Sequence, residues 1–271
     1  MWPKSFWYKI YEPFIRKAAG LGVASTEKDK ERYEHKYEYC DLLVAGSGPA
    51  GLSSAYAAAK NGAKVILAED KPRFGGSLLT DEVTIDNLSG KAWTDKIITE
   101  LKEMPNVIVK NRSQVFGYYD HNMTVMFERT GDHLENKPKY TPRQRLWYIR
   151  AKEVLLSTGS IERPIVFGNN DTPGIFLSAA AKEYIKVYGV LVGKKPLIFT
   201  NNDSAYETAL EFKKQGIDPI ILDTREEHSS ELIENAKNQN IKIKFSYAVI
   251  AANGYKKVKS AQIGKLNKDK T

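Results

Sequence analysis

Three glycines in the segment AGSGPAGL have the spacing of a turn that can hold phosphate groups. Gly46, Gly48 and Gly51 lie between the apolar run Asp41–Ala45 and an alanine-rich run. In a G-x-G-x-x-G turn the first glycine allows a tight bend, the second lets the backbone approach a pyrophosphate, and the third lets a helix pack closely on a strand. Free N–H groups at the start of that helix then face the phosphates. The segment is therefore a candidate dinucleotide-binding turn.

An acidic side chain follows at the position where a dinucleotide-binding unit binds the adenosine ribose. Glu69 is near the end of the next apolar run, KVILAED, and can accept hydrogen bonds from an adenosine ribose. A 2′-phosphate at that position would meet like charge, which disfavours NADP. Gly75 and Gly76 follow in KPRFGGSL, where Arg73 either reaches a phosphate or is simply solvated. A glycine turn with a purely structural role is the alternative to dinucleotide binding.

A second segment repeats this pattern without its glycines. Placing Gly62 on Gly216, an offset of 154 residues, lays TNNDSAY over the glycine turn. The three glycines and the acid then correspond, in order, to Thr200, Asn202, Ala205 and Asp223. Ala205 is small enough for helix packing and Asn202 tolerates a positive φ, so the scaffold can form. Side chains in the turn would fill the space where backbone meets phosphate. The second unit is either a scaffold that has lost its ligand or an unusual nucleotide site.

The elements that must position these residues alternate between strands and helices. Hydrophobic periodicity predicts helices over 52–62, 94–104, 178–189 and 207–216, and strands over 41–45, 64–70, 107–110, 114–119, 123–128, 144–151, within 153–160 and over 196–199. We expect the strands of the middle segment to form a β-rich, antiparallel excursion. Within it, YYDHN is a polar hairpin turn or a group able to transfer protons. The predicted fold class is α/β, a Rossmann-like fold with two dinucleotide-binding units of the flavoprotein type, the second degenerate and incomplete at its C-terminus.

These elements divide the chain into three parts. We expect an N-terminal extension at 1–40, a first dinucleotide-binding domain with a β-rich insertion at 41–190, and a second Rossmann-like unit, degenerate and truncated, at 191–271. The extension is aromatic and basic, then highly charged, with little to bury. The basic stretch 256–271 is a solvated tail, a partner-facing surface or the torn edge of a longer protein.

Composition argues against several other classes of function. The net charge of +8 would permit nucleic-acid binding, but the lysines are scattered among acidic residues, so no nucleic-acid partner is expected. No run approaches the roughly 18 apolar residues of a membrane span, and no signal peptide is recognisable, so no membrane partner is expected. Cys40 is the single cysteine, which fits a cytoplasmic location. The histidines lack metal-ligand spacing, and no nucleophile–histidine arrangement supports a hydrolase.

Several longer segments are more specific than the glycine motif. The chain resembles the alpha subunit of heterotetrameric sarcosine oxidase from Tyr11 to about residue 212, notably in CDLLVAGSGPAGL, VFGYYDHN, PRQRLWYIRAKEVLLSTGSIERPIVFGNNDTPGI and TNNDSAYETAL. The resemblance implies a complex that oxidatively demethylates sarcosine, passes the one-carbon unit to tetrahydrofolate and reduces oxygen to hydrogen peroxide. It also implies beta, gamma and delta partner subunits, NAD on this chain, and FAD and FMN in the beta subunit or at its border.

The resemblance and the glycine turn together give the candidate site residues. The cofactor-binding residues expected are Gly46, Ser47, Gly48, Pro49, Ala50, Gly51, Glu69, Asp70, Arg73, Gly76, Ser77, Val115, Thr158 and Gly159. Val115 would offer its backbone to the adenine, by analogy with related two-domain folds. No catalytic residue and no metal ligand is expected on this chain.

The family's alpha subunit is several times longer than this sequence. A ferredoxin-like region precedes the matching part and a folate-binding region follows it, so we expect a fragment that lacks both. Two alternatives remain open. One is an FAD-binding subunit of an amino-acid or opine dehydrogenase, and the other is a non-catalytic scaffold stabilised by its nucleotide.

Overall fold

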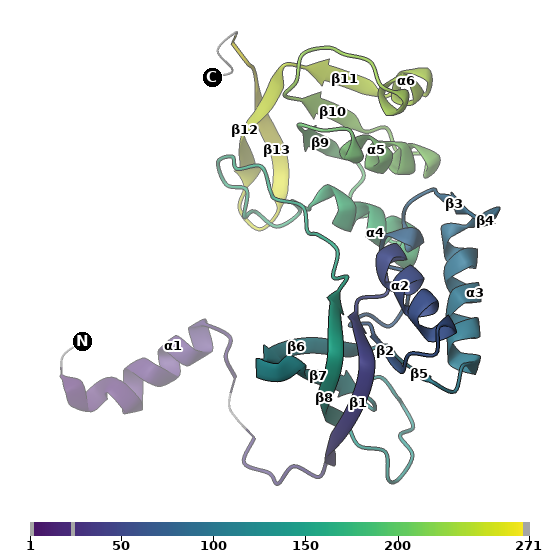
Figure 1. The fold of residues 1–271 in the computed structure, drawn as a ribbon. Coiled ribbons are helices and arrows are strands. Elements are labelled where there is room, and N and C mark those ends of the chain that lie inside the picture. The colour runs from purple at the N-terminus through teal and green to yellow at the C-terminus, as the bar shows by residue number, and fades with distance from the viewer. Residues whose placement is uncertain (1–2, 23–24, 268–271) are drawn as a thin grey trace.

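A computed structural model describes residues 3–22 and 25–267 and shows two α/β units (Figure 1). The first unit is built on a six-stranded sheet with the order β5-β2-β1-β8-β7-β6. Its strands are β1 (Tyr33–Ala45), β2 (Val65–Ala68), β5 (Val107–Lys110), β6 (Ser113–Tyr119), β7 (Met123–Arg129) and β8 (Gln144–Leu156). β5, β2, β1 and β8 run parallel, and β7 and β6 continue the sheet antiparallel. The parallel half is the part that a dinucleotide-binding unit requires.

Two helices cover one face of the parallel strands. α2 (Pro49–Lys60) joins β1 to β2, and α3 (Gly90–Glu103) leads into β5. Parallel neighbours need such crossovers because a tight turn cannot return the chain to the same end of the sheet. Leu52 of α2 and Leu101 of α3 are buried in one core with Val44 of β1. This packing fixes the glycine turn between β1 and α2.

The opposite face of the sheet is closed by the antiparallel half of the same sheet. Cys40 and Leu43 of β1 share a second core with Met126 of β7 and with Trp147 and Ile149 of β8. Successive side chains point to opposite faces of a strand, so β1 contributes to both cores. The strand that carries the glycine turn at its end is therefore held from both sides.

Shorter elements connect these parts. They are the one-turn helices η1 (Lys4–Phe6), η3 (Gly76–Leu79) and η4 (Asp120–Asn122), the π-helix η2 (Trp7–Tyr11), the helix α1 (Glu12–Ala18), and the two-residue strands β3 (Thr84–Ile85) and β4 (Leu88–Ser89). α1 extends away from both units, and its side chains are largely exposed (Figure 1).

The second unit repeats the strand–helix–strand pattern in a smaller sheet. β9 (Leu197–Thr200), β10 (Ile220–Asp223) and β11 (Lys242–Phe245) form a parallel sheet with β10 in the middle. Its helices and remaining strands are α4 (Ser178–Tyr188), α5 (Ser204–Lys214), α6 (Glu231–Asn238), β12 (Tyr247–Gly254) and β13 (Val258–Lys265). β12 and β13 pair antiparallel. Ala181 and Ile185 of α4 are buried in the core of this unit.

A buried lysine joins the two units. Lys182 of α4 is 8% exposed and its Nζ lies 2.7 Å from Oδ1 of Asp81 in the first unit. The same Nζ lies 2.6 Å from Oε2 of Glu207 on α5. Burial acts to lower the pKa of Lys182, but the two carboxylates outweigh it and the pKa is raised. The lysine is therefore held in its charged form between the units.

Three expectations about strands are corrected by the structure. β1 begins at Tyr33, inside the segment expected to be an extension, and pairs with β8 from that residue onward. β8 is one continuous strand rather than two, because the polar pair Lys152 and Glu153, which looks like a break, simply faces solvent. β5 pairs parallel with β2, so the middle strands complete the main sheet instead of leaving it.

The C-terminal half also holds elements that periodicity missed. Helix α6 is short, and its start is marked only by Ser230, whose Oγ accepts the N–H of Ile233. Part of the basic C-terminal stretch forms β13, whose side chains are mostly exposed. Such a strand is held by pairing with β12 rather than by a buried face, so its sequence carries little hydrophobic pattern. The domain limits drawn from the sequence stay predictions.

Candidate dinucleotide-binding site

Two glycines of the turn are required by the protein's own packing. Gly46 has φ +104°, and a Cβ on it would lie 2.3 Å from the carbonyl oxygen of Ser157. A Cβ on Gly51 would lie 1.9 Å from the carbonyl oxygen of Gly46. Neither position has room for a side chain. They bring β1, the start of α2 and the end of β8 into direct contact.

Gly48 differs from both of these glycines. Its φ is −66°, a value open to any residue, and a Cβ built on it would meet no protein atom within 4 Å. It occupies the N-cap of α2, with Pro49 at the first helical position. The fold itself does not need a glycine here. A bare backbone at the N-terminus of a helix does fit the approach of a pyrophosphate, which would face the free N–H groups and the positive end of the helix dipole.

The residues at the start of η3 lie against the glycine turn and form the opposite wall of the candidate site. A Cβ on Gly76, which has φ +55°, would lie 2.9 Å from the Cα of Gly48, so the two backbones approach closely. Gly75, just before η3, donates its N–H to the carbonyl oxygen of Ser47 at 3.1 Å. Ser77 follows on the exposed side. The residues present therefore fit the diphosphate of a dinucleotide.

Glu69 lies beside the turn, at the end of β2. The side chain is buried, and its Oε2 accepts hydrogen bonds from the N–H and the Oγ of Ser47 at 2.9 and 2.5 Å. Its Oε1 accepts the N–H of Lys71 at 3.0 Å. The ribose acid predicted from sequence is thus held at the edge of the glycine turn.

The remaining predicted residues surround this edge to different degrees. Pro49, Ala50, Asp70, Thr158 and Gly159 are exposed or partly exposed at the ends of their strands or at the start of α2. Val115 lies on β6, whose first residue, Ser113, donates its N–H to the carbonyl oxygen of Glu69 at 2.7 Å. The structure therefore brings the glycine turn, Glu69, η3 and the start of β6 together.

The side chain of Arg73 is hydrogen-bonded to the region of α4. Its Nη1 donates to the carbonyl oxygen of Val187 near the end of α4 at 2.8 Å. The neighbouring Lys71 pairs with Glu183 of the same helix. These contacts favour a structural role for Arg73, which fastens the loop after β2 to α4.

Ser157 was not among the predicted residues. Its backbone packs on Gly46, and its N–H donates to the carbonyl oxygen of Ala45 at 2.8 Å. Its Oγ is buried and has no hydrogen-bond partner among the described residues. An orphaned buried hydroxyl beside the glycine turn is suited to a ligand hydroxyl or phosphate oxygen. The sequence signal was its place at the end of a predicted strand, directly before the Thr-Gly pair.

In the second unit, side chains close the corresponding turn. The Oγ1 of Thr200 accepts the N–H of Asn202 at 3.1 Å and donates to its carbonyl oxygen. The Oδ1 of Asn202 accepts the N–H and the Oγ of Ser204 at the start of α5. These bonds engage the N–H groups of Asn202 and Ser204, whereas a glycine turn leaves such N–H groups free to bind phosphate. Ala205 is buried, as its expected packing role requires.

The acid of the second unit is also occupied. Asp223 is fully buried, accepts the Tyr206 hydroxyl at 2.9 Å, and receives Nε and Nη2 of Arg225 at 3.0 and 2.7 Å. Burial acts to raise the pKa of Asp223, but these hydrogen bonds outweigh it and the pKa is lowered. The carboxylate is thus paired inside the protein rather than presented to a ribose. This favours the interpretation of a scaffold without its nucleotide.

The segment YYDHN forms the turn between β6 and β7. Tyr118 donates its hydroxyl to Oδ1 of Asn122 at 2.7 Å, and Nδ2 of Asn122 donates to the carbonyl oxygen of Lys152. His121 and Asn122 have positive φ, as in a tight turn. Its polar groups are used in capping the hairpin.

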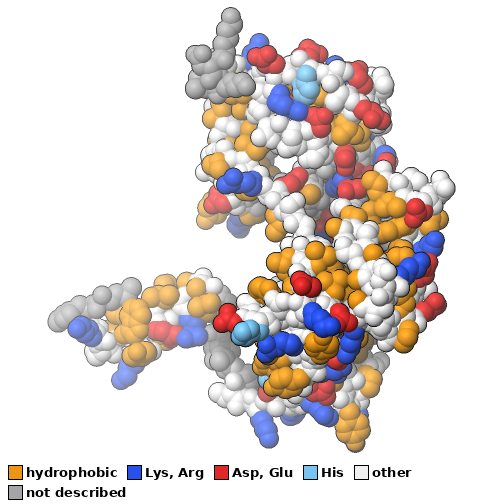
Figure 2. Space-filling model, viewed as in Figure 1, with side chains coloured by type: hydrophobic (Ala, Val, Ile, Leu, Met, Phe, Trp, Pro, Cys, Tyr) orange, Lys and Arg blue, Asp and Glu red, His pale blue; other side chains and the backbone are white. Residues whose placement is uncertain are grey.

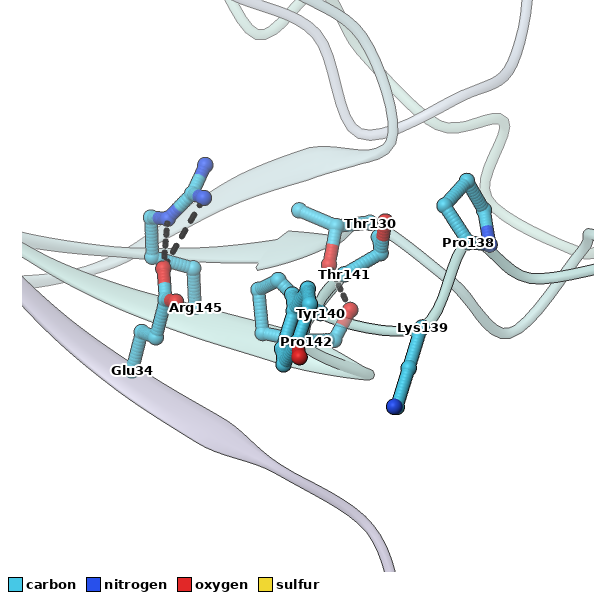
Figure 3. Close-up of a pocket in the computed structure, with 8 residues that line it drawn as sticks. All are labelled: Glu34, Thr130, Pro138, Lys139, Tyr140, Thr141, Pro142 and Arg145. Carbon is cyan, nitrogen blue, oxygen red and sulfur yellow. Dashed lines mark hydrogen bonds and ion pairs between the residues drawn. The ribbon is translucent and has the colours of Figure 1, made fainter.

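A separate hollow of about 530 Å³ lies near the beginning of β1 and β8 (Figure 3). Its wall holds the ion pair between Glu34 and Arg145, with Tyr140 from the preceding loop. The glycine turn lies at the other end of the same strands.

On the face seen in Figure 2, lysines and arginines are interspersed with acidic residues. Within residues 3–22 and 25–267, none of the helices combines the length and the apolar composition that a membrane span needs.

Comparison with known proteins identifies relatives of both the sequence and the fold. Residues 41–129, which contain the glycine turn and Glu69, match the family described as FAD dependent oxidoreductase. Among solved structures, L-proline dehydrogenase from P. horikoshii superimposes with a TM-score of 0.62 at 21% identity, over 92% of this chain and 42% of that one. T. acidophilum thioredoxin reductase gives a TM-score of 0.58 at 16% identity, over 83% and 70%. These likenesses confirm the predicted Rossmann-like, flavoprotein-type fold.

The sequence relatives are more specific. The chain is 46% identical over 226 residues to the sarcosine oxidase alpha subunit of Rhizobium meliloti, covering 83% of this chain and 23% of the relative. It is 37% identical to the sarcosine oxidase alpha subunit of Corynebacterium sp. strain U-96, covering 78% and 22%. An opine oxidase subunit from Agrobacterium tumefaciens is 27% identical, covering 60% and 33%. The chain spans less than a quarter of the length of the first two. The chain belongs to the family of sarcosine oxidase alpha subunits, and its residues 41–129 match the FAD dependent oxidoreductase model.

Proposed function

We propose that the glycine turn and Glu69 bind NAD, and that the chain serves as the dinucleotide-binding part of a sarcosine oxidase alpha subunit. The observation that carries the proposal is Gly48, which leaves bare backbone at the start of α2 where the protein itself needs no glycine. Glu69 stands beside this backbone, as an adenosine ribose requires. NAD and FAD share the ADP half that such a turn binds, so the turn alone admits either one. The resemblance to sarcosine oxidase alpha subunits is what favours NAD.

Each proposed contact has a simple physical role. The backbone from Gly46 to Gly51 and that of Gly76 and Ser77 would hold the diphosphate. Glu69 would accept from the ribose, and Asp70 would flank it. The backbone of Val115 would bound the adenine, and Thr158 and Gly159 would bound the dinucleotide beyond the end of β8. When bound, NAD would supply a site for hydride exchange, and these residues would bind and orient it.

The larger complex belongs to the proposal too. We expect oxidative demethylation of sarcosine to glycine, with the one-carbon unit passed to tetrahydrofolate and oxygen reduced to hydrogen peroxide. FAD and FMN would lie in a partner subunit or at its border, and beta, gamma and delta subunits would be the partners. We assign no catalytic residue to this chain. A cytoplasmic location is proposed from the single cysteine, Cys40.

A second candidate keeps the site and changes its occupant. The family match names FAD, and one relative is a subunit of an opine oxidase, so FAD in the first site of an amino-acid or opine dehydrogenase is the alternative. A purely structural nucleotide in a non-catalytic scaffold is the third possibility.

The deciding experiment is mass spectrometry of the nucleotide released from purified, heat-denatured protein. NAD at about one per chain supports the proposal, because, of the two units described, only the first has a glycine turn that is free to bind a dinucleotide. FAD at the same stoichiometry would move the protein to the second candidate. Co-expression with the neighbouring subunits and an assay for peroxide from sarcosine then test the complex. An active complex that is indifferent to Gly48→Val would favour the scaffold.

A further inference from the structure

Ser47 is buried between three parts of the site. It follows Gly46 in the turn and is 0% exposed. Its N–H and its Oγ both donate to Oε2 of Glu69. Its Oγ also accepts the N–H of Gly75, at 3.2 Å. The side chain of Ser47 is thus placed to act through Glu69, and the expected place of Ser47 among the cofactor contacts stays a prediction.

The hydrogen bonds of Glu69 limit what it can offer to a ribose. A carboxylate has roughly four acceptor positions, two on each oxygen. Both positions on Oε2 are taken by Ser47, and one on Oε1 is taken by the N–H of Lys71. One position, on Oε1, remains. Glu69 is 7% exposed, so the side chain has little room to turn and present its other oxygen.

We infer that Ser47 is a positioning residue, which fixes Glu69 so that the carboxylate accepts a single hydroxyl of the adenosine ribose through Oε1. The inference rests on the proposed dinucleotide site and specifies how that site recognises the ribose. Hydrogen bonds to an ionised carboxylate are strong and directional, so two of them from one residue set the plane of the carboxylate. The link from Ser47 to Gly75 ties that plane to the loop which forms the opposite wall.

The first test uses the unmodified chain and three probes. They are NAD and its analogues that lack either the 2′- or the 3′-hydroxyl of the adenosine ribose, with dissociation constants measured by calorimetry. We expect one analogue to bind about tenfold more weakly than NAD and the other within about twofold, because only one hydroxyl is bonded to a charged group. Equal weakening of both analogues would overturn the inference.

The second test removes the hydroxyl that holds Oε2. In Ser47→Ala the side-chain bond that holds Oε2 is removed and the carboxylate is free to turn, so we expect the tenfold difference between the two analogues to fall toward one. Adding Ser47→Ala to Glu69→Gln should change the ratio no further, because Ser47 acts only through Glu69. Ser89→Ala, which removes a helix-capping hydroxyl on α3, is the matched control and should keep the wild-type ratio.

The outcomes separate this inference from the proposed function. If the wild-type chain binds none of the three probes, the dinucleotide site itself is wrong and the inference falls with it. If the wild type binds NAD but Ser47→Ala keeps the wild-type ratio, only the role of Ser47 is wrong. If Ser47→Ala does not fold, the comparison of the two analogues on the wild-type chain still decides whether Glu69 accepts one hydroxyl, and equal weakening of both overturns the inference.

Discussion

The guanidinium of Arg225 lies across the carboxylate of Asp223, with Nε 3.0 Å from Oδ1 and Nη2 2.7 Å from Oδ2. Asp223 occupies the place in the second unit that Glu69 has in the first, at the end of the second strand of its βαβ unit. Glu69 keeps one acceptor position open, whereas Asp223 has a cation from its own chain. The two units therefore share a fold and differ in whether their acid is available.

Replacement of Gly48 by valine should remove the nucleotide without unfolding the protein. A valine side chain would stand where a pyrophosphate must approach, yet it meets no protein atom within 4 Å at its Cβ. Because valine is a poorer N-cap than glycine, we expect the free energy of unfolding to fall by about 1 kcal/mol, which leaves the protein folded, together with loss of bound nucleotide by mass spectrometry. Gly193→Val, at another glycine with open surroundings, is the control and should keep its nucleotide. Unaltered nucleotide content in Gly48→Val would refute the assignment of the turn.

Replacement of Gly51 by alanine should, in contrast, destabilise the fold itself. The new Cβ would lie 1.9 Å from the carbonyl oxygen of Gly46, so α2 must shift away from β1. We expect the free energy of unfolding to fall by about 2 kcal/mol, as for overpacked sites, measured by urea denaturation without added nucleotide. Full stability in this variant would mean that the close contact between helix and strand is absent.

Restoring glycines to the second turn should not create a second site. In the double variant Thr200→Gly, Asn202→Gly the turn loses its side-chain hydrogen bonds, but Arg225 still holds Asp223. A ribose would have to displace a paired, buried carboxylate. We expect nucleotide content to stay at the wild-type value by mass spectrometry, and an additional equivalent per chain would contradict this expectation.

The pair of Asp223 and Arg225 should stabilise the protein in a pH-dependent way. The pKa of Asp223 is held below its ordinary value of 3.8 in the folded protein. Its contribution is therefore complete above the unfolded pKa and is lost as the pH falls below about 4 and through the folded pKa. We expect Arg225→Met to lower the free energy of unfolding by about 3 kcal/mol at pH 7 and by progressively less below pH 4.

Urea denaturation across this pH range measures the effect of Arg225→Met. Arg163→Met, at an exposed arginine in the connection between the units, serves as the control. An equal loss of stability by Arg225→Met at pH 7 and at pH 3 would show that Asp223 is not the group responsible.

The local parts of the first site could be predicted from sequence because they depend on short-range rules. Glycine spacing, the alanine-rich helix and the acid after the second strand lie within one βαβ unit, and the structure places them as expected. The degenerate second turn could be predicted in the same way. Asn202 could tolerate a positive φ but does not adopt one, since hydrogen bonds with Thr200 and Ser204 shape the turn.

The parts that were missed depend on contacts between distant segments. The first half of β1 alternates tyrosine with charged residues and lacks an apolar core pattern, yet β8 pairs with it along its length. Ser157 and Ser47 gain their roles from neighbours that only the folded chain brings near. Arg225 follows Asp223 by two residues, but its direction is set by the end of the strand and by Asp203.

Lys182 resists separation of the two units. A movement that draws α4 away from the first unit separates the ammonium of Lys182 from Asp81, while Glu207 stays with the second unit. The separated lysine would keep one counter-charge and Asp81 would keep none, so the opened arrangement costs more than loss of a surface contact. The two units are therefore held together electrostatically, and because Lys182 is buried, salt screens this contact less than it screens a surface ion pair.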